Sequence, residues 1–308
     1  MPANTVHRRA AGRERNRSSL TQVSIALLKN RLALCGLIML ALFILLALCA
    51  PLLSPQNPYD LMQLDIMDGR LPPGSDSLGG ITYWLGTDDQ GRDLLSAILY
   101  GTRISLAVGF SSALLALLIG ASLGLIGAYA GGKTDALIMR IVDIQLSFPP
   151  ILIALILLAV LGQGVDKIIL ALVVTQWAYY ARTIRGSALV ERRRSYVDAA
   201  RSMALSNRRI LFRHILPNCL APLIVVATMR IAYAIMLEAT LSFLGIGLPV
   251  TEPSLGLLIA NGFEYLMSGD YWISFFPGLT LLLLIVAINL VGDALRDILN
   301  PRHEGGSS

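Results

Sequence analysis

Charged residues are scarce in this sequence. Asp, Glu, Lys and Arg make up 15% of its 308 residues and hydrophobic residues 55%, whereas ordinary globular chains hold roughly 25% and 45–50%. The apolar excess comes in blocks of about 20 residues, the length that an α-helix needs to cross a bilayer. The composition excludes a soluble domain and predicts an all-α, polytopic helical membrane protein. The net charge of +5 does not indicate nucleic-acid binding, because the basic residues follow the membrane topology.

Cysteine and histidine are equally scarce, with three residues of each. The cysteines lie in or beside apolar blocks and form no CxxC pair, which argues against a disulfide framework and against a cysteine metal site. No His, Ser or carboxylate set converges on one side of the expected topology. We therefore expect no catalytic site, no metal and no cofactor on this chain.

Six apolar blocks are long enough to be membrane-spanning helices. We expect them at about residues 32–53, 104–129, 136–161, 168–190, 221–244 and 272–290. The first block is too long for the apolar core of a signal peptide and lacks a convincing cleavage site, so we interpret it as a span. Residues 1–31 are expected to form a basic tail with a short helix on the membrane surface. Residues 54–102 are expected to form an external loop, and residues 303–308 a short tail.

The basic residues determine the orientation. With the N-terminus inside, twenty of the 25 Lys and Arg residues fall in inner segments, and only Arg70, Arg92, Arg103 and Lys167 fall outside. Arg230 is the one that remains within a span. Inner loops of membrane proteins carry this excess of positive charge. We therefore place both termini in the cytoplasm.

The densest basic stretch is an inner loop at residues 191–217, between the fourth and fifth blocks. Its residues 196–217 read YVDAARSMALSNRRILFRHILP. The arginines alone would indicate a solvated loop that only sets topology. The small residues Ala199, Ala200 and Ala204 instead favour close packing against a partner, and Pro217 is typical of the start of a helix.

This stretch resembles the EAA loop of ABC-transporter permeases, whose pattern is EAA, three residues, Gly, nine residues, then I-x-L-P. Asp198 stands here for Glu, Ala204 for Gly and His214 for Ile. Ala204 still fits because alanine is small and favours helix. The resemblance implies a short helix that docks on a cytoplasmic ATPase through Tyr196, Asp198, Ala199, Ala200, Arg201, Ala204, Leu216 and Pro217.

Further stretches match one branch of these permeases, the second permease subunit of the dipeptide, oligopeptide and nickel importers. They are LGTDDQGRDLLSAILYGTRISL (85–106), SFP (147–149), LSFLGIG (241–247), FPG (276–278) and GDALRD (292–297). The match covers about residues 30–302 and implies a transmembrane permease domain at residues 32–302 with a type I importer fold. It also implies a bacterial inner membrane, a homologous second permease, two cytoplasmic ATPases that bind ATP and Mg²⁺, and an external substrate-binding protein.

The resemblance leaves the cargo open. Peptides are expected from what the family transports most often, and nickel or another metal chelate is the alternative, because the run Trp177–Arg182 is similar to nickel-type relatives. A self-contained secondary transporter would show internal repeats and broken helices at the midplane. No clear repeat is present, and Pro149-Pro150 is a single possible break.

One stretch imitates a nucleotide-binding motif. Residues 127–134, GAYAGGKT, match the phosphate-loop pattern GxxxxGK[ST]. That motif functions only between a strand and a helix, and the block before it here is a membrane-length helix. We interpret the match as coincidence, so the energy source is expected on partner chains.

Three further features are candidates for function or packing. Arg230 and Glu238 lie within or near the fifth span and are interpreted as lining of a translocation path, as a structural ion pair, or as a charge that snorkels to the interface. Asp88, Arg92 and Asp93 precede the second span and are expected either to have a structural role or to contact the binding protein. Gly120 and Gly124 form a small-xxx-small face that would let two helices approach closely.

Overall fold

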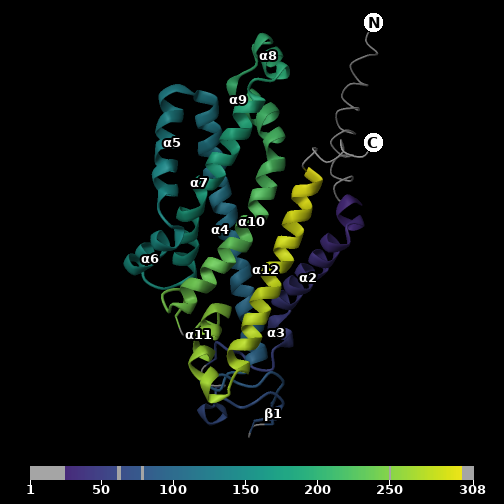
Figure 1. Cartoon of the computed structure of the whole chain (residues 1–308), viewed down its shortest axis with the longest axis vertical. Coiled ribbons are helices and arrows are strands. Elements are labelled where there is room, and N and C mark those ends of the chain that lie inside the picture. Colours follow the sequence, from purple (N-terminus) through teal and green to yellow (C-terminus); the bar gives the residue numbers. More distant parts are fainter. Residues whose placement is uncertain (1–24, 61–63, 78–79, 250, 300–308) are drawn as a thin grey trace.

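The computed structural model describes residues 25–60, 64–77, 80–249 and 251–299, and they form an almost entirely helical bundle (Figure 1). The tail at residues 1–24, which includes most of the expected surface helix, and the residues from 300 onward lie outside the described part. Two short strands, β1 (Ser75–Asp76) and β2 (Thr82–Tyr83), pair antiparallel. The helices are α2 (Arg31–Leu48), α3 (Ala50–Leu53), η2 (Ile66–Asp68), α4 (Leu94–Ala130), α5 (Gly132–Ser147), α6 (Pro150–Leu161), α7 (Val165–Glu191), α8 (Ser195–Ser202), α9 (Asn207–Ile210), η3 (Leu211–Ile215), α10 (Leu216–Phe243), α11 (Leu255–Tyr265), η4 (Leu266–Ser268) and α12 (Trp272–Leu299).

Length and apolarity qualify four helical stretches of the described chain as membrane spans. They are α2, α4, α12 and the continuous run from Asn207 to Phe243, which contains α9, η3 and α10. A fifth candidate is the pair α5 and α6, which bends by 90°. Pro149 and Pro150 cause the bend, because proline lacks an amide proton and holds the preceding residue extended, as at Phe148 with ψ 141°. The expected third span is therefore a broken span or a re-entrant loop.

The fourth expected span, α7, runs through the middle of the bundle and does not reach the same apolarity. Its inner half carries Arg182 and Arg185, which pair with Asp143 and Asp135 of α5. The helix contacts α4, α5, α6 and α10. Because protein covers so much of its surface, α7 needs less apolarity than a helix that faces lipid on most sides.

The most extensive helix contact in the described part of the bundle is that of α4 with α7. At Gly120 and Gly124 the backbone of α4 lies so close to α7 that an added Cβ atom would overlap the carbonyl oxygens of Trp177 and Ala181. This confirms that the two glycines allow a close helix approach. The side chains of Tyr180 and Ile184 fill the space beside the glycines.

The external part of the chain departs from expectation in two places. The second span begins at Leu94 rather than near Ile104, because the Asp93 carboxylate accepts a hydrogen bond from the Ser96 amide (2.8 Å) and caps the helix there. The sequence analysis also missed α11, between the fifth and sixth spans. Ser254 caps α11 by accepting from the Leu257 amide (3.1 Å), and this signal was readable in the sequence as serine before an apolar run.

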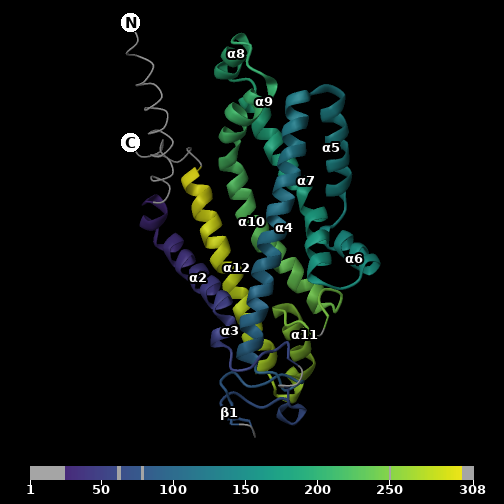
Figure 2. The same cartoon turned by 180° about the vertical axis from the view of Figure 1, so that it is seen from behind.

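The ends of the bundle differ in character. The helix α8 projects at one end, toward which α2 begins and α12 ends, whereas β1 and β2 lie at the other (Figures 1 and 2). The start of α2 and the end of α12 thus lie toward the same end of the bundle, as the expected topology requires.

Candidate functional site

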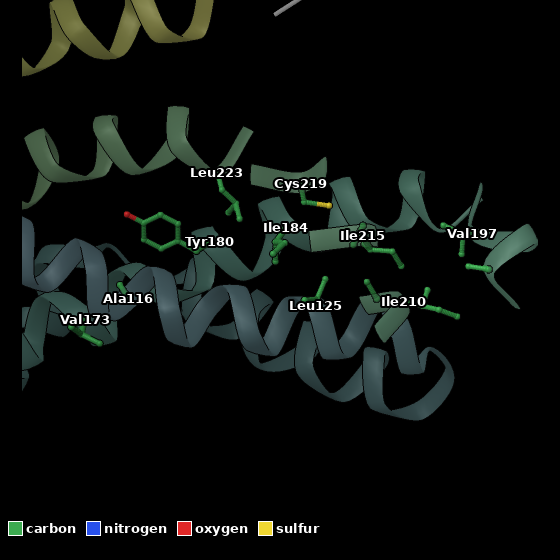
Figure 3. Packing of buried hydrophobic residues seen from close by; sticks show 13 residues of the cluster. Ala116, Leu125, Val173, Tyr180, Ile184, Val197, Ile210, Ile215, Cys219 and Leu223 are labelled. Atoms are coloured by element: carbon green, nitrogen blue, oxygen red, sulfur yellow. The ribbon is translucent and has the colours of Figure 1, made fainter. Parts of the chain in front are cut away.

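The expected docking segment contains a short helix, α8, with two unlike faces. Val197 and Ala200 belong to a hydrophobic cluster of buried residues that also includes residues of α4, α7, α9, η3 and α10, and Figure 3 shows Val197 at one end of this cluster. Asp198, Ala199 and Arg201 face outward. Asp198 lies in the first turn and Arg201 in the last, where each charge complements the helix dipole. The exposed face is therefore free for a partner, whereas Ala200 is committed to this chain's own core.

Ala204 ends α8 in a left-handed conformation, with φ 54°. The Ala204 amide donates to the Arg201 carbonyl (2.8 Å) and the Leu205 amide to the Ala200 carbonyl (3.2 Å), which together form a Schellman motif. The expectation that alanine suits this position as a helix former is wrong, because Ala204 lies beyond the helix. The EAA pattern has glycine here, and glycine adopts positive φ without strain.

Replacing Ala204 with glycine should stabilise the chain by about 1 kcal/mol, because a left-handed non-glycine residue costs roughly that much. The measurement is the free energy of unfolding in detergent by denaturant titration. The matched control is Ala199→Gly, at an exposed position inside α8, which should destabilise by up to about 1 kcal/mol. Equal signs for the two changes would contradict the assigned backbone geometry.

Tyr196 connects the two ends of the docking segment. Its hydroxyl donates to the Glu191 carboxylate at the end of α7 (2.6 Å) and accepts from the Asn218 amide group in α10 (3.1 Å). Burial, reinforced by the hydrogen bond to Glu191, raises the pKa of Tyr196 to about 12. The phenol therefore stays protonated at physiological pH and holds α7, α8 and α10 together.

The segment after α8 is helical for longer than expected. Pro217 does lie in the first turn of α10, as predicted, but α9 and the π-helical segment η3 precede it without a break. The Leu216 amide donates to the Leu211 carbonyl, five residues earlier. A π-helical turn commonly accommodates such an interruption of the helical hydrogen bonds, here beside a proline that donates none.

A second set of contacts connects the docking segment to α4. Tyr129 donates a hydrogen bond to Asn207 (2.5 Å), and Arg192 donates to the Ala128 carbonyl (2.8 Å). Sequence reasoning missed these residues, together with Glu191 and Asn218, because each lies at the end of a long helix and belongs to no motif. The GAYAGGKT stretch proves to be the turn between α4 and α5, with Gly131 and Gly132 at positive φ and a helix, not a strand, before it.

The two charged residues of the fifth span do not pair with each other. Glu238 is fully buried between α10 and α4, where it accepts hydrogen bonds from Ser105 (3.0 Å) and Ser242 (2.9 Å). It therefore does not line a surface of this chain. The Arg230 guanidinium instead lies over the ring of Tyr179, 3.4 Å from its centroid, and 5.4 Å from that of Tyr233.

The acidic motif before α4 is buried and holds this segment of the chain together. Asp88 and Arg92 form an ion pair at 2.6 Å with exposed side-chain fractions of 0% and 1%. Asp93 is equally buried and caps α4. Of the two roles expected for these residues, their burial supports the structural one, because the side chains of Asp88, Arg92 and Asp93 do not reach the surface of the chain.

Two positions in this motif require glycine for steric reasons. Gly86 and Gly91 adopt positive φ, and a Cβ atom would overlap the Leu71 carbonyl oxygen at Gly86 and that of Asp65 at Gly91. Trp272 of α12 also packs closely against Gly86 and donates from its indole to the Thr87 carbonyl (3.3 Å). The LGTDDQGRD stretch therefore folds the external segment onto the start of α4 and α12.

Comparison with known proteins agrees with these features. The family model described as "Binding-protein-dependent transport system inner membrane component" matches residues 116–305. The model for the "N-terminal TM domain of oligopeptide transport permease C" matches residues 19–73.

Permeases named for peptide transport are similar over nearly the whole chain. A putative peptide transport system permease of Brucella abortus is 42% identical over 276 residues, 90% of each chain. The dipeptide transport system permease DppC of Haemophilus influenzae is 40% identical, over 89% of this chain and 92% of its own. The oligopeptide permease OppC of Bacillus subtilis is 38% identical, over 89% and 86%.

A solved structure shares the fold. An inward-facing form of the MetNI methionine ABC transporter contains a chain that superimposes with a TM-score of 0.55 at 22% identity. The superposition covers 66% of this chain and 96% of that one. The helical core is thus that of a type I importer permease.

Proposed function

The chain belongs to the family of inner-membrane components of binding-protein-dependent transport systems, on the branch of the dipeptide and oligopeptide permeases. From this premise we propose that it is one of two permease subunits of an ATP-driven peptide importer in a bacterial inner membrane. A homologous second permease completes the translocation path. Two cytoplasmic ATPases bind ATP and Mg²⁺ and carry out hydrolysis. An external substrate-binding protein delivers the peptide.

The observation that carries the proposal is the construction of α8. Its exposed face offers Asp198, Ala199 and Arg201 to a partner, whereas Val197 and Ala200 are buried in a hydrophobic cluster that also contains residues of α7 and α10. The Tyr196 hydrogen bonds connect the same helices. A movement of α8 that an ATPase causes would therefore move α7 and α10 together. Coupling of ATP hydrolysis to a path that opens alternately to either side of the membrane requires such a movement.

The exposed side of α8 provides the test. Ala199→Trp places a bulky side chain on the face that would dock, whereas a bulky residue at Ala200 would disturb this chain's own core. In cells that lack the chain and carry a restoring copy, Ala199→Trp should lower uptake of labelled di- and tripeptides about tenfold or more and reduce co-purification of the ATPases. A loss of 1.4 kcal/mol in docking already corresponds to a tenfold change.

The matched control is Thr134→Trp, also exposed and at the same end of the bundle but outside α8. It should leave uptake and co-purification unchanged, and both variants should reach wild-type abundance in the membrane. Full uptake with Ala199→Trp would refute docking through α8. No peptide uptake with the wild-type copy would refute the peptide cargo, and accumulation of nickel or metal chelates would then be measured in the same strains.

A further inference from the structure

Arg230 lies deep within the membrane-spanning part of the bundle. It precedes the outer end of α10 at Phe243 by thirteen residues, and Tyr179 follows the outer end of α7 at Val165 by fourteen. At 1.5 Å per residue both lie about 20 Å from the outer ends of their helices. The hydrocarbon core of a bilayer is about 30 Å thick, so the cation lies well inside it.

The surroundings of Arg230 stabilise a cation but leave it without a counter-charge. Tyr179 and Tyr233 provide aromatic faces, a favourable setting for guanidinium. Among the described residues, no carboxylate lies within ion-pair distance of Arg230 and no acceptor takes a hydrogen bond from it. The nearby acid on α10, Glu238, is already satisfied by two serine hydroxyls.

The same side of α7 carries further polar groups at its surface. Arg182 follows Tyr179 by three residues and so shares its helix face. Arg182 pairs with Asp143 of α5, and more than half of each side chain is exposed. Charges at such depth face a water-filled cavity or another protein, not lipid. The face formed by α5, α7 and α10 is therefore the side that meets the translocation path.

Resting on the proposed function, we infer that Arg230 binds the carboxylate of the peptide cargo within the path. A guanidinium stacked on an aromatic ring keeps its in-plane N–H groups available, and their fork matches a carboxylate with two parallel hydrogen bonds. Tyr179 and Tyr233 act as positioning residues that hold the fork in place. The ligand class is a free carboxylate on a small peptide.

The test uses the assembled transporter in proteoliposomes, with alanyl-alanine and its C-terminal amide as cargoes at saturating binding protein. Arg230→Gln should lower the initial uptake of alanyl-alanine about 10- to 100-fold, because a charge-assisted bond is lost. Uptake of the amide should change less than about twofold. Arg230→Lys, which keeps the charge but not the fork, should fall between. Basal ATP hydrolysis and co-purification of the second permease should stay at wild-type levels.

The control is Arg31→Gln, an exposed arginine at the start of α2, outside the face formed by α5, α7 and α10, which should leave uptake unchanged. Unchanged uptake with Arg230→Gln would overturn the inference, and so would an equal fall for both cargoes, which would indicate a structural role. Loss of co-purification would overturn it in favour of a carboxylate on the second permease. If the wild-type complex imports no peptide, the proposed function fails and this inference falls with it.

Discussion

Replacing Asp88 with alanine should lower the free energy of unfolding by about 3–5 kcal/mol, because it removes the carboxylate that is ion-paired with the buried Arg92 guanidinium. The carboxylate also organises the loop backbone, since its Oδ1 accepts from the amides of Gln90 and Arg92, both at 2.9 Å. The measurement is denaturant unfolding of the purified chain in detergent. Membrane abundance in cells should fall in parallel.

The control is Asp76→Ala, in the same external segment. Asp76 is exposed and accepts one hydrogen bond, from Thr82 (2.8 Å), so its loss should cost less than about 1 kcal/mol. If Asp88→Ala were no more destabilising than Asp76→Ala, the ion pair would not be the element that holds the external segment to α4.

The double change Gly120→Ala and Gly124→Ala should destabilise the bundle by about 2–6 kcal/mol. Each added methyl group would overlap a backbone carbonyl oxygen of α7, at Trp177 or Ala181, and backbone atoms cannot rotate out of the way. Overpacking of this kind costs typically 1–3 kcal/mol per site. The change is again measured as the free energy of unfolding, and transport should fall with it because α7 leads directly into the docking segment.

The control for this prediction is Gly186→Ala, a helical glycine of α7 with no atom within 4 Å of an added Cβ. There the methyl group meets open space, and the gain in helix propensity should stabilise by up to about 1 kcal/mol. Destabilisation by Gly186→Ala, or none by the double change, would contradict the α4–α7 contact described here.

Most of the helices follow from local pattern, and the failures have local explanations. The apolar blocks predict α2, α4, α10 and α12 because covering a bilayer demands long apolar stretches. The block at residues 136–161 looks like one span by composition, but two consecutive prolines divide it, and their effect on direction depends on which helices the two halves then meet. α11 was missed because its eleven residues are too few for a span.

The docking segment was predicted from its motif, but the role of each residue within it was not. The sequence identifies residues 196–217 through arginines, small residues and Pro217. Whether a residue of this segment is buried or exposed depends on the residues that it contacts in the folded chain. Ala199 faces solvent and Ala200 is buried in the hydrophobic cluster, though they are neighbours in the chain, because a helical step of 100° turns one side chain out and the other in.

The sequence by itself determined that this protein folds in a lipid bilayer, where most of its spans lie, and that it resembles peptide permeases. These three properties depend on the length of the apolar blocks, on the asymmetry of charge between loops and on the order of the motifs. Only the tertiary structure decided which charged residues are paired within the chain and which can bind another molecule. Asp88, Arg92 and Glu238 are satisfied within the chain by partners up to 133 residues away. The Arg230 guanidinium lies over the rings of Tyr179 and Tyr233 and pairs with no carboxylate of the described residues. The reason is that the cost of burying a charge depends on the groups that surround it, and helix packing brings those groups together from distant parts of the chain.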